Sequence, residues 1–149
     1  MQTQQFCTFF VDGIQFGIEV LKVQEVLKYH EMTPVPLASA VVSGLINLRG
    51  QIVTALDLRA RLGLPLRPEE ALPMNVVIRA EDGAVSLLVD EIGDVLETTE
   101  EAFEEPPATL GESARDLIRG VYKLDGRLLL ILEIEKVLNT EAASAAEAA

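Results

Sequence analysis

The amino-acid sequence predicts an all-β protein built from a duplicated unit. Short apolar runs recur along the chain, bounded by Gly, Pro or Asp-Gly, which is typical of β barrels and sandwiches. The segment Gly44–Gly63 aligns without a gap on Gly120–Asn139, and Val20–Leu27 matches Val89–Leu96 upstream. Five residues are identical in the longer alignment: Gly44, Leu48, Gly50, Leu56 and Leu62 fall on Gly120, Leu124, Gly126, Leu132 and Leu138.

In the first half, turn residues divide the apolar runs into predicted strands. Asp12-Gly13 and Arg49-Gly50 are the two hairpin turns, and Leu21–Tyr29 begins with a helical turn. Thr33–Pro36 is extended, because a proline disfavours helical backbone in the residue before it. Asp57–Leu62 is a short helix ended by glycine and proline. The predicted strands are Gln5–Val11, Gln15–Val20, Val41–Leu48 and Gln51–Leu56.

The second half repeats this pattern after a connector rich in proline and charge, Leu64–Pro73. Asp125-Gly126 is a strong two-residue hairpin signal, and Glu133–Leu138 mirrors the earlier short helix. Thr98–Glu101 has the spacing of a capping box, which predicts a brief helical turn there. The predicted strands are Met74–Ala80, Ala84–Val89, Gly93–Thr98, Gly120–Leu124 and Arg127–Leu132.

The chain length predicts a single domain over residues 5–139. Its approximate halves, 5–63 and 74–139, are too small to be stable separately, so we expect them to share a core, with exchange of strands possible between them. Residues 140–149 are rich in Ala and Glu and are expected to form a disordered tail.

The composition excludes several classes of function. The formal net charge is −12, so the chain is expected to repel nucleic acid and anionic lipid surfaces. The N-terminal residues lack the pattern of a signal peptide, and no apolar stretch reaches transmembrane length. We therefore expect a cytoplasmic protein that binds no nucleic acid.

No catalytic or cofactor motif is recognisable. The one histidine, His30, lies in a polar stretch and is expected on the surface, and Cys7 is expected to be a small buried apolar residue. The sequence has no zinc, calcium or phosphate-loop pattern, so we expect no metal site, no cofactor and no enzyme activity. The acidic run Glu97–Glu105 is expected to be a solvated loop, with steering of a basic partner as an alternative.

The two copies differ at the tip of their repeated hairpin. The second copy has Asp125-Gly126 there, whereas the first has Arg49-Gly50, and arginine forms tight turns less readily than aspartate. A residue that departs from the turn preference without an evident structural benefit indicates a functional role. Arg49 could therefore present its guanidinium to a carboxylate or carbonyl of a partner, or be an ordinary surface arginine.

The sequence resembles the CheW family, the scaffold proteins of bacterial chemotaxis arrays. The resemblance covers nearly all of residues 5–139, and its most specific part is GLINLRGQIV followed by DLR, at Gly44–Val53 and Asp57–Arg59. It implies two five-stranded SH3-like β barrels on a common hydrophobic core, with short helices. It also implies no catalysis, and an adaptor that couples transmembrane chemoreceptors to the histidine kinase CheA of a two-component system.

The resemblance further implies partners and site residues. The cytoplasmic tip of a chemoreceptor (a methyl-accepting chemotaxis protein) would bind in a groove between the barrels, and the regulatory domain of the kinase would bind barrel to barrel. The protein would then be cytoplasmic at receptor arrays, reaching the membrane only through receptors. The kinase-facing residues are not assigned. The receptor-facing positions carried over are Val23, Glu25, Gly44, Asn47, Arg49 and, on the second-copy strand, Val89.

Three alternatives remain open from the sequence. The chain could be a CheW-like adaptor of a non-flagellar chemosensory pathway, controlling pilus motility or a second messenger. A β barrel that binds oligonucleotides would need aromatic platforms and basic grooves, but the chain has five Phe, two Tyr and no Trp. A hydrolase with paired carboxylic acids is the third alternative.

Overall fold

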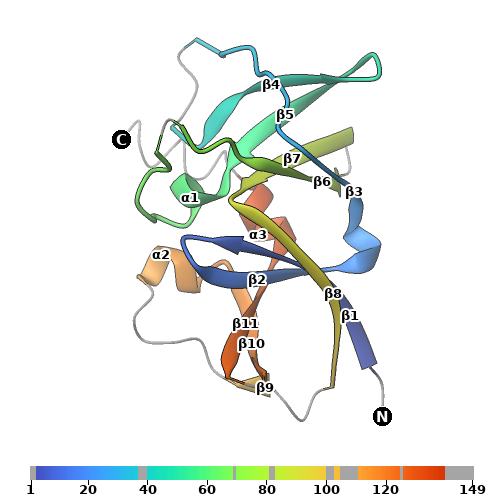
Figure 1. Ribbon diagram of the computed structural model, residues 1–149, viewed down its shortest axis with the longest axis vertical. Helices are drawn as coiled ribbons and strands as arrows, with labels where there is room; N and C mark the ends of the chain where they lie inside the picture. Colours follow the sequence, from blue (N-terminus) through green and yellow to red (C-terminus); the bar gives the residue numbers. More distant parts are fainter. Residues whose placement is uncertain are drawn as a thin grey trace.

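A computed structural model describes residues 3–36, 40–68, 70–80, 83–99, 103–104, 111–124 and 126–139 of the chain. The structure consists of two antiparallel-rich β sheets that lie one above the other, with short helices between and beside them (Figure 1). The prediction of an all-β fold is confirmed. The predicted tail, 140–149, lies outside the described residues.

Sheet 1 has six strands in the order β8-β1-β2-β11-β10-β9, the last of which has only two residues. The strands of sheet 1 are β1 (Thr3–Val11), β2 (Ile14–Glu19), β8 (Glu91–Thr99), β9 (Phe103–Glu104), β10 (Ile118–Leu124) and β11 (Arg127–Leu132). Sheet 2 has five strands in the order β3-β6-β7-β5-β4. The strands of sheet 2 are β3 (Val23–Leu27), β4 (Val42–Leu48), β5 (Gln51–Asp57), β6 (Met74–Ala80) and β7 (Gly83–Val89).

The strand order of the two sheets reflects the sequence duplication. However, each sheet contains strands from both copies of the repeat. Hairpin β1–β2 belongs to the first copy and lies between β8 and β11 of the second copy, with β1 paired to β8 and β2 paired to β11. Hairpin β6–β7 belongs to the second copy and lies between β3 and β5 of the first, with β6 paired to β3 and β7 paired to β5. Each sheet contains one parallel pair, β2 with β11 and β5 with β7. The two copies therefore exchange hairpins, and the chain crosses between the sheets at two equivalent places.

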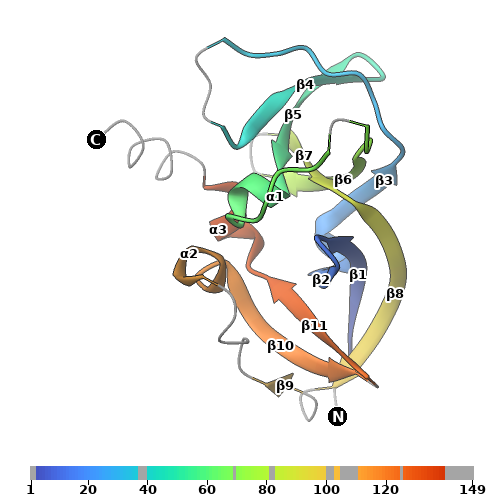
Figure 2. The same cartoon turned by 60° about the vertical axis from the view of Figure 1, so that its left-hand side comes forward.

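The two crossovers are short. The chain passes from β2 to β3 through the 3₁₀ helix η1 (Val20–Lys22), which confirms the helical turn expected before β3. It passes from β7 to β8 through the single residue Asp90, and β8 then runs from the upper sheet to the lower one (Figures 1 and 2).

The helices confirm two predictions and add a third element. Helix α1 (Leu58–Arg61) follows β5 with Asp57 as its N-cap, and α3 (Ile134–Leu138) follows β11 at the equivalent place. Helix α2 (Glu112–Arg115) and strand β9 were not predicted. The helical turn predicted at Thr98–Glu101 is wrong for its first two residues, because Thr98 and Thr99 continue β8, and Glu100 and Glu101 lie outside the described residues.

A hydrophobic core is shared by both sheets. Its largest cluster joins Phe9 and Phe16 of sheet 1 to Leu56 and Ile78 of sheet 2, with α1 and α3 contributing Leu58 and Ile134. Each sheet also encloses a smaller cluster, around Ile46 and Val77 in sheet 2 and around Phe6 and Leu129 in sheet 1. Burial of this shared apolar surface ties the two copies into one body.

Candidate partner-binding site

Strands β4 and β5 are joined by the tight turn at Arg49-Gly50, where the sequence places a residue that forms such turns less readily. Arg49 and Gly50 both have positive φ, 51° and 89°, as a type I′ turn requires. The side-chain oxygen of Asn47 accepts a hydrogen bond from the Gly50 amide at 2.9 Å, which closes the turn. A positive φ is uncommon for a residue with a side chain, so Arg49 holds this place at a conformational cost. Arg49 therefore occupies a turn position that asparagine, aspartate or glycine would adopt more readily.

Arg49 is paired with Glu25 on the edge strand β3. Its Nη2 makes an ion pair with Glu25 Oε1, and its Nη1 lies 3.3 Å from Oε1 and 3.4 Å from Oε2. The side chain of Arg49 is 65% exposed and that of Glu25 is 23% exposed. The hydrogen bonds from Arg49 lower the pKa of Glu25 below its ordinary value. The two charged residues thus form one exposed polar unit, joined from the hairpin tip to the sheet edge.

Val23 and the residues before it extend this unit along the surface. Val23 is half-buried at the start of β3, opposite Ile78 of β6, and packs against the shared core. Two positions earlier, Leu21 of η1 is 87% exposed, an unusual place for a leucine. No sequence motif marked Leu21 as a site residue. The repeat could have indicated that Leu21 is exposed, because Leu21 aligns with a charged residue, Asp90.

Leu21 separates two grooves that meet at η1. One groove of 460 Å³ runs along sheet 1 and is lined by Gln4, Gln5, Glu19, Val20, Leu21 and Glu97. The other, of 590 Å³, lies between η1, the end of β6 and α3, and its apolar lining includes Leu21, Ile134 and Leu138. Both hollows therefore border η1, the 3₁₀ helix that leads directly into Val23 at the start of β3.

Gly44, predicted to face the receptor, is buried inside the fold. A Cβ at this position would lie 2.7 Å from the carbonyl oxygen of Thr33 and 3.0 Å from the Cβ of Met32. The segment at Thr33 pairs with Leu45 through two backbone hydrogen bonds of 2.9 and 2.8 Å. Gly44 thus allows the segment at Thr33 to pack closely against β4, and it lies beneath the surface.

Val89 is likewise unavailable at the surface. It is 0% exposed at the end of β7 and belongs to the shared core. Of the six positions carried over, the structure brings Glu25, Asn47 and Arg49 together at the surface, with Val23 beside them. Gly44 and Val89 lie beneath this surface. The Val89 side chain therefore does not line a surface groove.

The remaining candidates for chemistry are ordinary structural residues. Cys7 is half-buried rather than fully buried, and burial raises the pKa of its thiol, which disfavours the reactive thiolate. His30 is half-buried, with Nδ1 3.0 Å from the carbonyl oxygen of Lys28. Within the described residues, no cluster of three or more His, Cys, Asp or Glu side chains could hold a metal ion.

Two further findings concern the acidic run and membrane contact. Glu97 is exposed on β8 and accepts a hydrogen bond from Gln5 at 3.2 Å, whereas Glu100, Glu101 and Glu105 lie outside the described residues. No helix in the described part of the chain has the length and apolarity needed to span a bilayer.

Comparison with known proteins identifies the family. A model of the CheW-like domain matches residues 5–142. The chain is 31% identical over 143 residues to the chemotaxis protein CheW of Bacillus subtilis, covering 96% of this chain and 92% of the relative. It is 29% identical over the same length and coverage to CheW of Rhizobium meliloti.

The fold is also that of a solved structure. The crystal structure of scaffolding protein TtCheW from Thermoanaerobacter tengcongensis matches with a TM-score of 0.80 at 23% identity, over 93% of this chain and 90% of that one. The expected pair of β barrels and the expected absence of enzyme activity agree with this family. The chain belongs to the CheW-like domain family of chemotaxis proteins.

Proposed function

We propose that this protein links the cytoplasmic tips of chemoreceptors to the histidine kinase CheA, without chemistry of its own. The observation that carries the proposal is the exposed Arg49–Glu25 pair, held at the tip of a strained hairpin turn. The turn itself does not require arginine, because asparagine or aspartate would make the same turn at lower conformational cost. A strained, solvent-facing arginine is accounted for if a partner uses its guanidinium.

The receptor-binding surface consists of Val23, Glu25, Asn47 and Arg49. Val23 supplies apolar contact, and the pair of charges can bind a helical receptor tip that presents a carboxylate and an amide or basic group. Asn47 acts by closing the turn that positions Arg49. Gly44 and Val89 contribute from beneath, by shaping the backbone and core under this surface. The kinase regulatory domain binds elsewhere on the barrels.

A scaffold of this kind contributes coupling free energy. If the receptor binds more tightly when the kinase is bound, the kinase must bind more tightly by the same factor when the receptor is bound. The protein would work on the cytoplasmic side of the membrane, at receptor arrays, and would reach the membrane only through the receptors. The overall negative charge of the chain, −12, disfavours direct binding to anionic lipid.

A pull-down with two partners tests the proposal. The chain is incubated with a receptor-tip fragment, with the kinase regulatory domain, and with both. We expect Arg49→Gln to lose the receptor fragment and to keep the kinase domain. Arg127→Gln is the matched control, because Arg127 is an exposed arginine beside the tip of the repeat-related hairpin β10–β11. Equal retention of the receptor fragment by both variants would overturn the assignment.

The pilus alternative is not favoured. The chain is also 28% identical to protein PilI of Pseudomonas aeruginosa, but this match covers only 76% of the chain and 64% of that relative. The CheW relatives from Bacillus subtilis and Rhizobium meliloti are covered over 92% of their length.

A further inference from the structure

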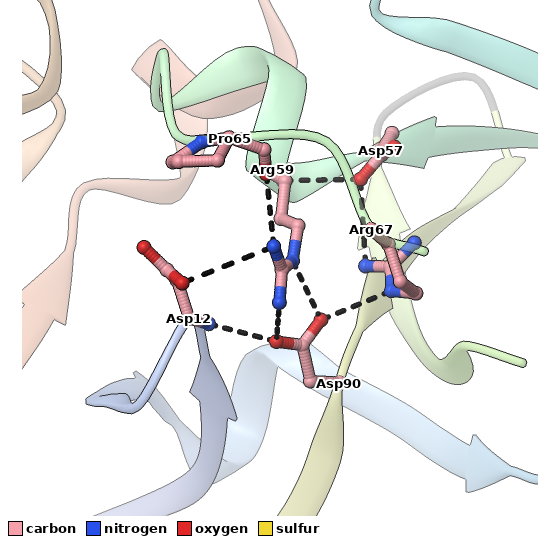
Figure 3. A network of polar contacts seen from close by, with 6 residues as sticks. All are labelled: Asp12, Asp57, Arg59, Pro65, Arg67 and Asp90. Carbon is pink, nitrogen blue, oxygen red and sulfur yellow. Dashed lines mark hydrogen bonds and ion pairs between the residues drawn. The ribbon is translucent and has the colours of Figure 1, made fainter. Parts of the chain in front are cut away.

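The second crossover between the sheets is held by a network of charges. Asp90, the residue that joins β7 of sheet 2 to β8 of sheet 1, is the centre of this network (Figure 3). One of its carboxylate oxygens accepts hydrogen bonds from Nε of Arg59 and Nε of Arg67, both at 3.0 Å. The other accepts from Nη2 of Arg59 at 2.6 Å and from the backbone amide of Asp12 at 2.7 Å.

These donors come from three segments on both sides of the crossover. Asp12 lies in the β1–β2 turn of sheet 1, Arg59 in α1 after sheet 2, and Arg67 in the connector that leads to β6. The side chains of Asp90, Arg59 and Arg67 are only 19%, 12% and 8% exposed. Arg59 also donates to the carbonyl oxygen of Pro65 at 2.9 Å, which holds the connector against the helix. One carboxylate therefore joins the turn, the helix and the connector.

The equivalent crossover of the first copy has different residues at the two central positions of this network. At the equivalent crossover Asp90 is replaced by Leu21, and Arg59 is replaced by Glu135. Leu21 and Glu135 both line the open 590 Å³ groove, and Leu21 is 87% exposed. The same topology thus occurs once with a partly buried ion-pair network and once with an open groove. A departure between otherwise equivalent places is where a function distinct from folding is expected.

We propose that Asp90 is a positioning residue that fixes sheet 1 relative to sheet 2, and so gives the receptor-binding surface its shape. This proposal rests on the proposed function. A receptor tip that contacts Val23 on sheet 2 and extends past η1 into the 460 Å³ groove on sheet 1 touches both sheets. Its affinity then depends on how the sheets are oriented. The network holds that orientation at one crossover. Among the described residues at the opposite crossover, the ion pair of Arg119 with Glu19 lies within sheet 1 and does not join the two sheets.

The test compares Asp90→Asn with Glu135→Gln. Both replace an acid by its amide at one of the two equivalent crossovers, but only Asp90 holds arginines. Residual dipolar couplings of backbone amides are measured on the free chain, because they give the orientation of one sheet relative to the other. Affinity for a receptor-tip fragment is measured by calorimetry, well below the melting temperature of each variant.

We expect Asp90→Asn to reorient the sheets while couplings within each sheet still fit the original structure, and to lower receptor affinity at least tenfold. Glu135→Gln should change neither. If Asp90→Asn does not fold, Arg67→Gln removes one arm of the network and should show the same reorientation to a smaller extent. An unchanged orientation in the folded variant overturns the proposal, as does reorientation without loss of affinity.

Failure of the proposed function would look different. A wild-type chain that binds no receptor tip overturns the proposed function and, with it, the claim that Asp90 shapes a receptor-binding surface. The dipolar couplings need no partner, so they still decide separately whether Asp90 fixes the orientation of the sheets.

Discussion

Replacing Gly44 by alanine separates a structural role from a receptor contact at this position. The new Cβ would lie 2.7 Å from the Thr33 carbonyl oxygen, closer than real Cβ atoms approach, and the clash is with backbone. The segment at Thr33 must therefore move away from β4. That movement breaks its two backbone hydrogen bonds to Leu45, 2.9 and 2.8 Å long. At about 1 kcal/mol for each bond, we expect a loss of about 2 kcal/mol of unfolding free energy.

Thermal unfolding followed by circular dichroism measures this loss. For a chain of this size, about 2 kcal/mol corresponds to a fall of roughly 6 °C in the midpoint. Gly111→Ala is the control, because a Cβ at Gly111 has nothing within 4 Å and its φ is −65°. A Gly44→Ala variant that melts like the wild type would refute the close-packing account and return Gly44 to the list of possible contact residues.

Three further variants follow from the same structure. Arg49→Asn should stabilise the chain by about 0.5 kcal/mol, because Asn-Gly is favoured in a type I′ turn. The same substitution should weaken receptor binding. A denaturant titration that finds destabilisation would contradict the conformational strain at Arg49. Arg49→Gln should raise the pKa of Glu25, whose pKa Arg49 lowers, and a carboxyl titration by NMR that finds no change would show that the pair does not form in solution. Asp90→Asn should cost about 2 kcal/mol near neutral pH, the range for hydrogen bonds to charged groups. Partial burial favours the neutral acid, but hydrogen bonds from Arg59, the Asp12 amide and Arg67 lower the pKa of Asp90 overall. Its contribution is therefore complete above the unfolded value of about 3.9 and is lost as the pH falls through the lower folded value, so wild type and variant should converge in acid. A difference in stability that stays constant down to low pH would contradict this.

Local signals in the sequence predicted the local structure well. Asp12-Gly13 and Arg49-Gly50 are both hairpin turns with positive φ, and Asp57 caps the helix that follows β5. These features depend on backbone preferences of neighbouring residues, which a sequence displays directly. The ladder between β2 and β11 is different, because it joins residues more than a hundred positions apart, and turn residues and periodicity do not specify such pairings.

The site was predicted only in part, for a related reason. Glu25 and Arg49 are recognisable as charged residues in a specific motif, and the structure brings them together. Gly44 and Val89 belong to the same motifs, but a motif does not distinguish a contact residue from one that packs beneath it. Arg67 was read only as part of a charged connector, whereas it is 8% exposed and bound to Asp90. Its burial depends on a partner across the crossover, which the sequence does not reveal.

The central claim is that the receptor binds over β3 and the tip of the β4–β5 hairpin. The most direct measurement is an NMR titration of the isotopically labelled chain with a receptor-tip fragment. We expect the largest amide shift changes at Val23, Glu25, Asn47 and Arg49, and we expect them to disappear in Arg49→Gln. Shift changes confined to the repeat-related hairpin β10–β11, or unchanged in Arg49→Gln, would contradict it.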